Sequence, residues 1–364
     1  MDIGALPTQL LAERPHLFSP ATVAVAAADI DRMAGVIAAI ERVAALTAYR
    51  QRVLSWAPEI ARHEPGSAGV FFGYDFHLTA DGPKLIEINT NAGGGFLAAA
   101  QSGNQGVMEA FVAMFRAECR QPLRTLAIVD STPASQYLYP DFLLCRQLLL
   151  EHGVDAVIAE PRELSLCQGG LWYQERRIDL VYNRLTDFAL EAADHVVLKQ
   201  AYLDGSVVLT PHPRAHALYA DKRNLVVLGD DGQLAEWGVD AETRACLTGG
   251  VPQTEIVAAD RAADLWARRR QLFFKPAGGF GAKATYRGDK MTRGVFEQVV
   301  AGNYVAQALV PPSLVRLDDG SELKADIRCY AYNGRIQLVA ARLWQGQTTN
   351  FRTPSGGFAR VVTA

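Results

Sequence analysis

Two short runs, GVFFGYDFHL and PKLIEIN, are rich in β-branched and aromatic residues and flank the turn signal TADG. Runs of this composition are typical of strands, and a short connection that contains glycine is typical of a β-hairpin. A hairpin fixes the register of its two strands, so it also decides which side chains share a face. The sequence therefore predicts a hairpin over residues 69–89, followed directly by a glycine-rich loop.

Glu87 and Asn89 alternate with isoleucines on the second strand, so the period of two places both polar side chains on one face. The hairpin can bring Asp75 beside Glu87. Asn91 and three glycines follow, and they allow close approach of a ligand or substrate. Carboxylate and amide oxygens are hard ligands that suit Mg²⁺, which usually also takes substrate phosphates. The alternative is the ordinary polar face of a solvated edge strand.

The length of 364 residues suggests more than one domain, and the chain divides into three regions. Residues 1–120 hold a long amphipathic helix expected over about residues 30 to 60, then the hairpin. Residues 121–212 alternate strand, helix and strand, which indicates a small α/β layer with parallel strands. Residues 213–364 hold a second glycine-rich loop and a hairpin around Asn333. The expected class is thus α+β with an α/β layer.

Lys275 ends the apolar strand LFF and enters the loop PAGGFGAK. A lysine there can reach phosphate oxygens while glycine N–H groups cover them, although glycine-rich turns are also common as ordinary turns. The chain contains no G-x-x-x-x-G-K-[ST] motif, which argues against a P-loop, and GGGFLAAA lacks the spacing of a dinucleotide-binding fold.

Four polar residues lie along the last hairpin and at its exit. Asp326 and Arg328 share a strand face, and Arg342 and Asn350 follow. A surface ion pair is the plain interpretation. Phosphoryl transfer, however, also requires arginines near a pair of acidic residues and near a loop that carries a lysine, because cationic groups offset the charge of the transferred phosphoryl.

Several classes of protein receive no support. The net charge is −3 without a long basic block, so neither nucleic acid nor a membrane surface is an expected partner. The five cysteines contain no C-x-x-C pair, no apolar run is long enough to span a bilayer, and no signal peptide is visible. His77, His212 and His216 lack ligand spacing and are expected to be structural. A cytoplasmic location is the default expectation.

With these motifs in view, the chain resembles the ATP-grasp superfamily, and most closely its glutathione synthetase-like ligases. GYDFHLTADGPKLIEINTN is similar to the family motif in which an Asp is followed about a dozen residues later by E-x-N. The resemblance implies that Asp75, Glu87 and Asn89 bind two Mg²⁺ ions. It implies that Lys222 in YADKRN and Lys275 in FFKPAGG contact ATP phosphates.

GGFGAK looks like the lid loop over the phosphates, and YVAQALVPP looks like the hinge strand that brackets adenine. The implied nucleotide-binding residues are Gly278, Gly279 and Gly281 of the lid and Gln307, Ala308 and Val310 of the hinge.

The run from DIRCYAYNG to TPSGG resembles the D-x-R … A-R … N … GG pattern of the family. By that resemblance Asp326 faces the ribose, Arg328 and Arg342 face phosphates, and Asn350 lies near the metals. LVYNRLTDF resembles the arginine motif that ends the preceding domain, so Arg184 is expected to meet the acid substrate.

The order of these motifs departs from most of the superfamily, because E-x-N comes first here. This looks like the circular permutation of eukaryotic-type glutathione synthetases and glutathionylspermidine synthetase-like proteins. The tail of residues 351–364 is then expected to lead toward the helix that starts near residue 30.

The function implied is an ADP-forming ligase that joins a small carboxylate to an amine through an acyl phosphate. An ATP-grasp phosphotransferase and a non-catalytic nucleotide-binding protein are the alternatives. The acid and the amine stay open, and a homodimer is expected by analogy alone.

Overall fold

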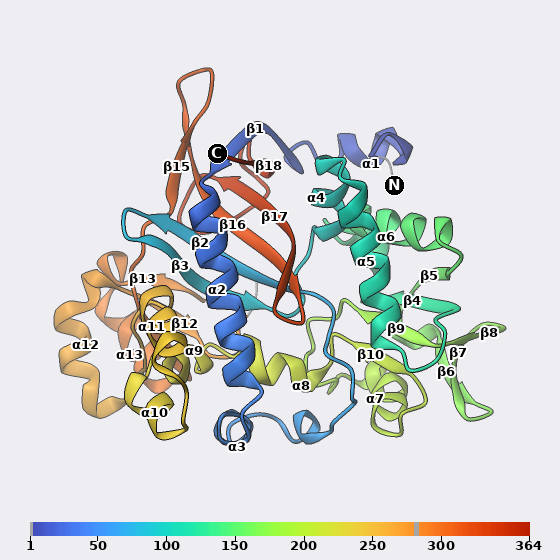
Figure 1. Ribbon diagram of the computed structural model, residues 1–364, viewed down its shortest axis with the longest axis horizontal. Helices are drawn as coiled ribbons and strands as arrows, with labels where there is room; N and C mark the ends of the chain where they lie inside the picture. The colour runs from blue at the N-terminus through green and yellow to red at the C-terminus, as the bar shows by residue number, and fades with distance from the viewer. Residues whose placement is uncertain (1–2, 280–283) are drawn as a thin grey trace.

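The computed structural model describes residues 3–279 and 284–364, and its largest sheet combines strands from both ends of the chain (Figure 1). The strand order is β1-β18-β17-β16-β2-β3, and β15 pairs with β16. Neighbouring strands run antiparallel except β1 and β18, which are parallel. The strands are β1 (Phe18–Val25), β2 (Phe72–Thr79), β3 (Gly82–Asn89), β15 (Ser313–Arg316), β16 (Glu322–Tyr332), β17 (Arg335–Trp344) and β18 (Gly357–Thr363). The predicted hairpin is therefore confirmed as β2 and β3.

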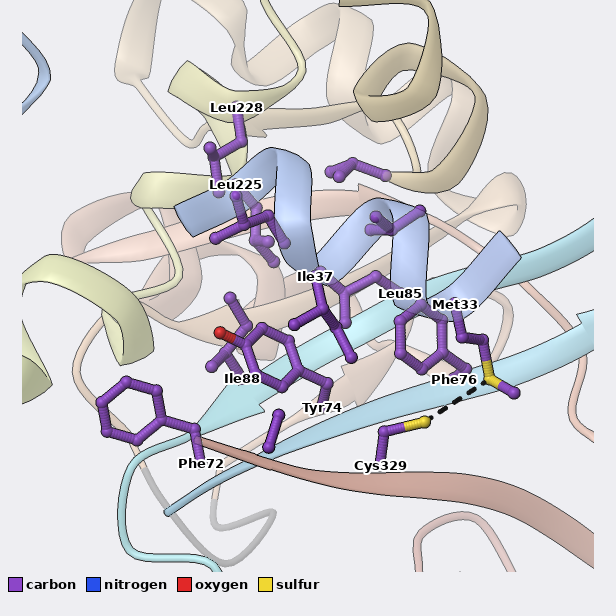
Figure 2. Close-up of a cluster of buried hydrophobic side chains, with 14 of the residues drawn as sticks. Met33, Ile37, Phe72, Tyr74, Phe76, Leu85, Ile88, Leu225, Leu228 and Cys329 are labelled. Atoms are coloured by element: carbon purple, nitrogen blue, oxygen red, sulfur yellow. Dashed lines mark hydrogen bonds between the residues drawn. The ribbon is translucent and has the colours of Figure 1, made fainter. Parts of the chain in front are cut away.

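Helices cover both faces of this sheet. On one face, α2 (Ala27–Ala44) lies across the strands; Figure 2 shows its Met33 and Ile37 packed with Tyr74 and Phe76 of β2. On the other face, α4 (Gly95–Ser102) and α5 (Gln105–Glu118) build a second core. Since Tyr74 and Phe76 point at α2, the residue between them points away from it. That residue is Asp75.

The long helix expected over residues 30 to 60 is two helices, so that prediction is wrong. α2 ends at Ala44, Leu46 is extended with φ −71° and ψ 135°, and α3 (Thr47–Leu54) starts in a new direction. In α3, Tyr49 is fully buried and its hydroxyl donates to the Leu218 carbonyl at 2.8 Å. Burial of that aromatic side chain outweighs the continuity of one helix.

The α/β layer is confirmed as a parallel sheet in the order β10-β9-β4-β5. Helices α5 and α6 pack on one face of this parallel sheet, and α7 packs on its other face. A small antiparallel sheet, β6-β7-β8, extends from the α7 side (Figure 1). These elements are β4 (Thr125–Val129), α6 (Tyr139–Glu151), β5 (Asp155–Ala159), β6 (Leu164–Cys167), β7 (Gly170–Tyr173), β8 (Arg176–Ile178), β9 (Leu180–Asn183), α7 (Val196–Leu203) and β10 (Val208–Thr210).

A further antiparallel sheet, β11-β14-β12-β13, carries the loop that follows Lys275. Its core lies against α12 and α13, and α9, α10 and α11 lie between it and α2 (Figure 1). Pro311 and Pro312 separate β14 from β15. The elements not yet given are α1 (Thr8–Ala12), α8 (Pro213–Ala215), α9 (Asn224–Leu228), α10 (Asp231–Glu236), α11 (Ala241–Gly250), β11 (Thr254–Ile256), α12 (Ala262–Arg268), β12 (Leu272–Pro276), β13 (Tyr286–Arg287), α13 (Arg293–Ala301) and β14 (Tyr304–Ala308).

The C-terminal strand β18 leads to the start of α2, in the direction expected from the order of the motifs. The amide of Ala364 donates to the Val25 carbonyl at 3.0 Å, and the Ala27 amide donates to the Ala364 carbonyl at 3.3 Å. The domain boundaries and the circular permutation themselves stay predictions. In the described ranges, no helix has both the length and the apolar character needed to cross a bilayer.

Candidate functional site

The hairpin β2–β3 brings the three predicted metal ligands together. Asp75 lies directly opposite Glu87 in the strand register, and Gly73 lies opposite Asn89. The Asn89 amide nitrogen donates to Asp75 Oδ2 at 3.0 Å and to Glu87 Oε1 at 3.1 Å. The shared face inferred from the sequence is therefore present.

A β-bulge at Ile86 links this hairpin to Lys275. Asp75 pairs with Glu87 and Phe76 pairs with Leu85, so Ile86 has no partner across the ladder. Lys275 Nζ donates to the Ile86 carbonyl at 2.9 Å and to Gln307 Oε1 at 2.7 Å. Through this bulge, the Ile86 carbonyl of the large sheet accepts a hydrogen bond from Lys275, which lies on β12 of the other sheet just before the glycine-rich loop.

Two buried lysines set the charge of this region. Lys222 Nζ donates to the Gly279 carbonyl at 2.7 Å, and its side chain, like that of Lys275, is at least nine-tenths buried. Burial lowers the pKa of Lys275 to about 8, and the charge of Glu87 opposes that effect. Burial raises the pKa of Glu87, but Lys222, Lys275, the Asn89 amide and Arg342 together lower it to about 2. Glu87 is therefore an anion at neutral pH, and in the described part of the chain its only hydrogen-bond donor is Asn89.

Asp75 has different surroundings from Glu87. Arg328 lies opposite Asp75 on β16, and its Nε and Nη2 atoms donate to the two carboxylate oxygens at 2.6 and 2.7 Å. Arg342 Nη2 donates to Asp75 Oδ2 at 2.8 Å. Arg342 also holds Asp326 through two hydrogen bonds of 2.8 Å. The cluster therefore alternates two arginines with two aspartates, all buried or nearly so, and each charge depends on its neighbours.

Asn350 does not reach this cluster. Its amide nitrogen donates to the carbonyls of Gln345 and Thr348, and its Oδ1 accepts from Arg352 N and Thr353 Oγ1. Asn350 thus ties its own loop together, and its expected place near the metals stays a prediction. The side chain that reaches the cluster is that of the preceding residue: Thr349 Oγ1 donates to Asp326 Oδ2 at 2.9 Å.

Arg184 lies at the topological switch point of the parallel sheet, where the order in which the chain adds strands reverses. The chain passes from β4 outward to β5 and then returns to β9 on the other side of β4, and ligands of open α/β sheets bind at such a point, beyond the carboxyl ends of the strands. Arg184 follows β9, and Asp130 follows β4. Burial raises the pKa of Asp130 to about 6, although the positive charge of Arg184 opposes that effect.

The Arg184 guanidinium contacts only neutral groups in the described part of the chain, although it is 6% exposed. Nη1 donates to the Tyr182 hydroxyl at 3.2 Å and Nη2 to the Asn91 carbonyl at 3.4 Å, while Nε is buried and has no hydrogen-bond partner among residues 3–279 and 284–364. Asn91 donates in turn to the Arg184 and Leu185 carbonyls, and its Oδ1 is also buried without a partner in the described ranges. The two predicted substrate residues are therefore in contact, and both hold an unused polar atom.

Comparison with known proteins gives a fold but no close relative. No family model and no curated protein matches the chain. Among solved structures, a glutathione synthetase-like effector from Globodera pallida in its apo form is similar over 95% of this chain and 90% of its own, with a TM-score of 0.59 at 10% identity. A provisionally named gamma-glutamylcysteine synthetase from Methylobacillus flagellatus KT is similar over 88% and 83%, with a TM-score of 0.54 at 12% identity. The chain has a glutathione synthetase-like ATP-grasp fold.

The two segments predicted to be the hinge and the lid, and called so here, are only partly described. On the hinge, the Ala308 amide donates to the Gln253 carbonyl at 2.8 Å, and the Val310 carbonyl pairs with His77 Nδ1 at 2.8 Å. In the lid, Gly278 has open space where a side chain would stand, while Gly281 lies outside the described residues. The nucleotide contacts expected of these residues and of Gln307 stay predictions.

Sequence reasoning missed Asp130, Thr349 and the Ile86 carbonyl. Asp130 could have been found, because it directly follows the apolar strand LAIV in a region predicted to be a parallel sheet. The bulge at Ile86 leaves no comparable signal, since IEIN alternates like a regular strand.

Proposed function

We propose that this protein is an ATP-dependent, ADP-forming ligase that joins a small carboxylic acid to an amine. In this proposal a phosphoryl group passes from ATP to the acid carboxylate, the amine attacks the resulting acyl phosphate, and an amide, ADP and phosphate leave. The class of fold supports the proposal without specifying the reaction.

The observation that carries the proposal is that the loop after β3 contacts both Arg184 and Arg328, a member of the cluster of two arginines and two aspartates. The carbonyl of Gly93 accepts from Arg328 Nη1 at 3.4 Å and from the Tyr330 hydroxyl at 2.9 Å. Two residues earlier, the carbonyl of Asn91 accepts from Arg184 Nη2. In this proposal, a carboxylate bound by Arg184 would lie beside the loop that also contacts Arg328, a group proposed to face phosphates. Such proximity is what phosphoryl transfer to an acid needs.

The residues present suit a magnesium nucleotide. Glu87 is anionic and has no cation in direct contact within the described chain, and Asn89 adds an amide oxygen. Lys222, Lys275 and Arg342 surround it with positive charge that phosphates can share. Bound Mg²⁺ would offset charge on the phosphates. The chain itself supplies the lysines and arginines that orient them, and it needs no nucleophile of its own for this chemistry.

We further propose that the acid carries an amino group. Arg184 offers a buried cation that contacts no anionic group of the described chain, and Asp130 offers a carboxyl group at the neighbouring strand end. A ligand with a carboxylate and an ammonium group would match the two charges, and each would offset the desolvation of the other.

The proposal is tested by phosphate release from ATP and Mg²⁺ across an array of carboxylic acids, with and without pooled amines. Hydroxylamine is included because it traps an acyl phosphate as a hydroxamate. Acid-dependent release with hydroxamate formed is the expected result. A stable phosphorylated product would show a phosphotransferase instead, and nucleotide binding without release under any pairing would contradict catalysis of ligation.

A further inference from the structure

The two carboxylates of the proposed metal site differ in how accessible they are. Asp75 is 1% exposed, and its oxygens accept four hydrogen bonds: two from Arg328, one from Arg342 and one from Asn89. Among the described residues, Glu87 on the neighbouring strand accepts one hydrogen bond, from Asn89. A cation that enters the site therefore meets one open carboxylate and one that two guanidinium groups already cover.

Arg328 is the group that covers Asp75 most completely. It is 5% exposed and makes a bidentate pair with Asp75, the strongest geometry for an arginine and a carboxylate. Its other contacts among the described residues are with neutral groups: a hydrogen bond to the Gly93 carbonyl at 3.4 Å and the ring of Tyr330. Gly73 makes room for it, because a Cβ there would lie 3.1 Å from Arg328 Nε.

Arg328 cannot leave Asp75 without a new anionic partner. A buried guanidinium without its counter-ion is strongly unfavourable, and a divalent cation repels it instead of replacing the counter-ion. Arg342 is less free still, because it remains paired with Asp326. Phosphate oxygens are acceptors of the right charge and geometry for a guanidinium.

We propose that Arg328 blocks Asp75 in the nucleotide-free protein, so that a divalent cation alone can bind only Glu87 and Asn89. Asp75 becomes available to the cation when a phosphate group replaces it as the partner of the Arg328 guanidinium. Cation and nucleotide binding are then positively coupled through one arginine. The coupling to nucleotide rests on the proposed function; the block itself does not.

The block is tested by Mn²⁺ binding to the full chain without nucleotide, followed by electron paramagnetic resonance of the free ion. Arg328→Gln is compared with the wild-type chain, and circular dichroism verifies the fold. We expect the variant to bind Mn²⁺ at least ~10-fold more tightly, within the usual range of coupling between sites. An unchanged or weaker affinity overturns the proposal. If Arg328→Gln does not fold, Arg328→Lys serves, because lysine keeps the charge but not the bidentate pair.

Two controls separate the block from a simple change of charge. Arg316→Gln removes an exposed arginine of β15 and is expected to leave Mn²⁺ binding as it was. In the double variant Arg328→Gln/Asp75→Asn the gain is expected to vanish, because the freed carboxylate is gone. A gain that persists there shows that lost repulsion alone is responsible and overturns the proposal.

The coupling is tested by repeating the titration with saturating ADP. We expect ADP to raise the Mn²⁺ affinity of the wild-type chain at least ~10-fold and to raise that of Arg328→Gln less. Equal gains in both chains overturn the coupling. If ADP does not bind the wild-type chain, the proposed function fails, while the nucleotide-free comparison still decides whether Arg328 blocks Asp75.

Discussion

At the scale of single residues, surroundings separate groups of the same chemistry. Asp75 and Glu87 are carboxylates at paired positions of one hairpin, yet guanidinium groups saturate Asp75 while Glu87 is anionic with one amide donor. Lys275 and Arg184 are both buried cations that donate to two oxygens, but Arg184 also has a buried Nε without a partner among the described residues. Glu87 and Arg184 are therefore the groups best placed to meet a ligand.

Replacing Glu87 by Gln tests its proposed role as the open metal ligand. We expect kcat of the ligase reaction to fall at least ~100-fold, the scale for loss of a major electrostatic element in a site. The fold should persist, because Gln retains an acceptor for Asn89. Steady-state kinetics at saturating ATP measure the effect, and near-normal turnover would remove Glu87 from the metal site.

The lowered pKa of Lys275 predicts a pH dependence of nucleotide binding. Its folded pKa of about 8 means that the free protein loses this charge as pH rises through 8, whereas bound phosphate favours the protonated form. We expect the Kd for ADP to rise by up to ~10-fold per pH unit above 8. Lys275→Arg should move this rise to higher pH, and calorimetric titration from pH 7 to pH 9.5 compares the two chains. A wild-type Kd that stays flat would contradict the assignment.

Asp130→Asn tests the proposed amino group of the acid. We expect KM for the amino-bearing acid to rise ~10- to 100-fold, the scale for losing a charged partner, and KM for its deamino analogue to change little. Competition between the two acids, measured by phosphate release, gives the ratio directly. If the variant weakens both acids alike, Asp130 does not contact an amino group.

At the scale of elements, the bulge of β3 and the loop after it contact charged residues on, or directly after, strands of three different sheets. The bulge presents the Ile86 carbonyl to Lys275, and the loop contacts Arg328 at Gly93 and Arg184 at Asn91. Asp141 of α6 anchors the end of this loop, because its buried carboxylate accepts the amides of Gly94, Phe96 and Leu97 at the start of α4. One buried acid thus fixes where the glycine-rich loop enters its helix.

Asp141→Ala should destabilise the protein by ~2–4 kcal/mol, because it leaves three buried amides without acceptors. It should also weaken binding of the acid, since the loop beside Arg184 loses its anchor. Urea unfolding measures the first effect and KM the second. Glu109→Ala, an exposed change on α5, is the matched control. Stability equal to that control would show that the loop is held elsewhere.

At the scale of the whole molecule, the two ends of the chain complete one sheet. β18 lies between β1 and β17 (Figure 1), and the carbonyl of Ala364, directly after β18, accepts from the Ala27 amide at the start of α2. The strands that carry Asp75, Arg328 and Arg342 are therefore held in a sheet whose far edge depends on residues from both ends.

Deletion of residues 361–364 should lower the free energy of unfolding by ~2–5 kcal/mol, because it removes parallel pairing with β1 and the acceptor for the Ala27 amide. Val362→Thr, at a residue that is 41% exposed, is the control and should have a small effect. Denaturant unfolding of both chains checks this, and equal stability would show that pairing of the chain ends contributes little.

The sequence alone was enough to predict the hairpin, the parallel layer and the shared face of Glu87 and Asn89, because period and turn chemistry are local properties. It also pointed to Arg184 and Asn91, which contact each other. Its helix over residues 30 to 60 was wrong, because burial of Tyr49 is decided by a partner far along the chain.

Only the tertiary structure decided which carboxylate is open, which arginine covers Asp75, and which loop joins Arg328 to Arg184. Residue type and spacing are the same whether a side chain is paired or free. Pairing depends on strands brought together from distant parts of the chain, and the bulge at Ile86 depends on the register between them. The chemistry available was therefore readable from the sequence, while its accessibility was set by folding.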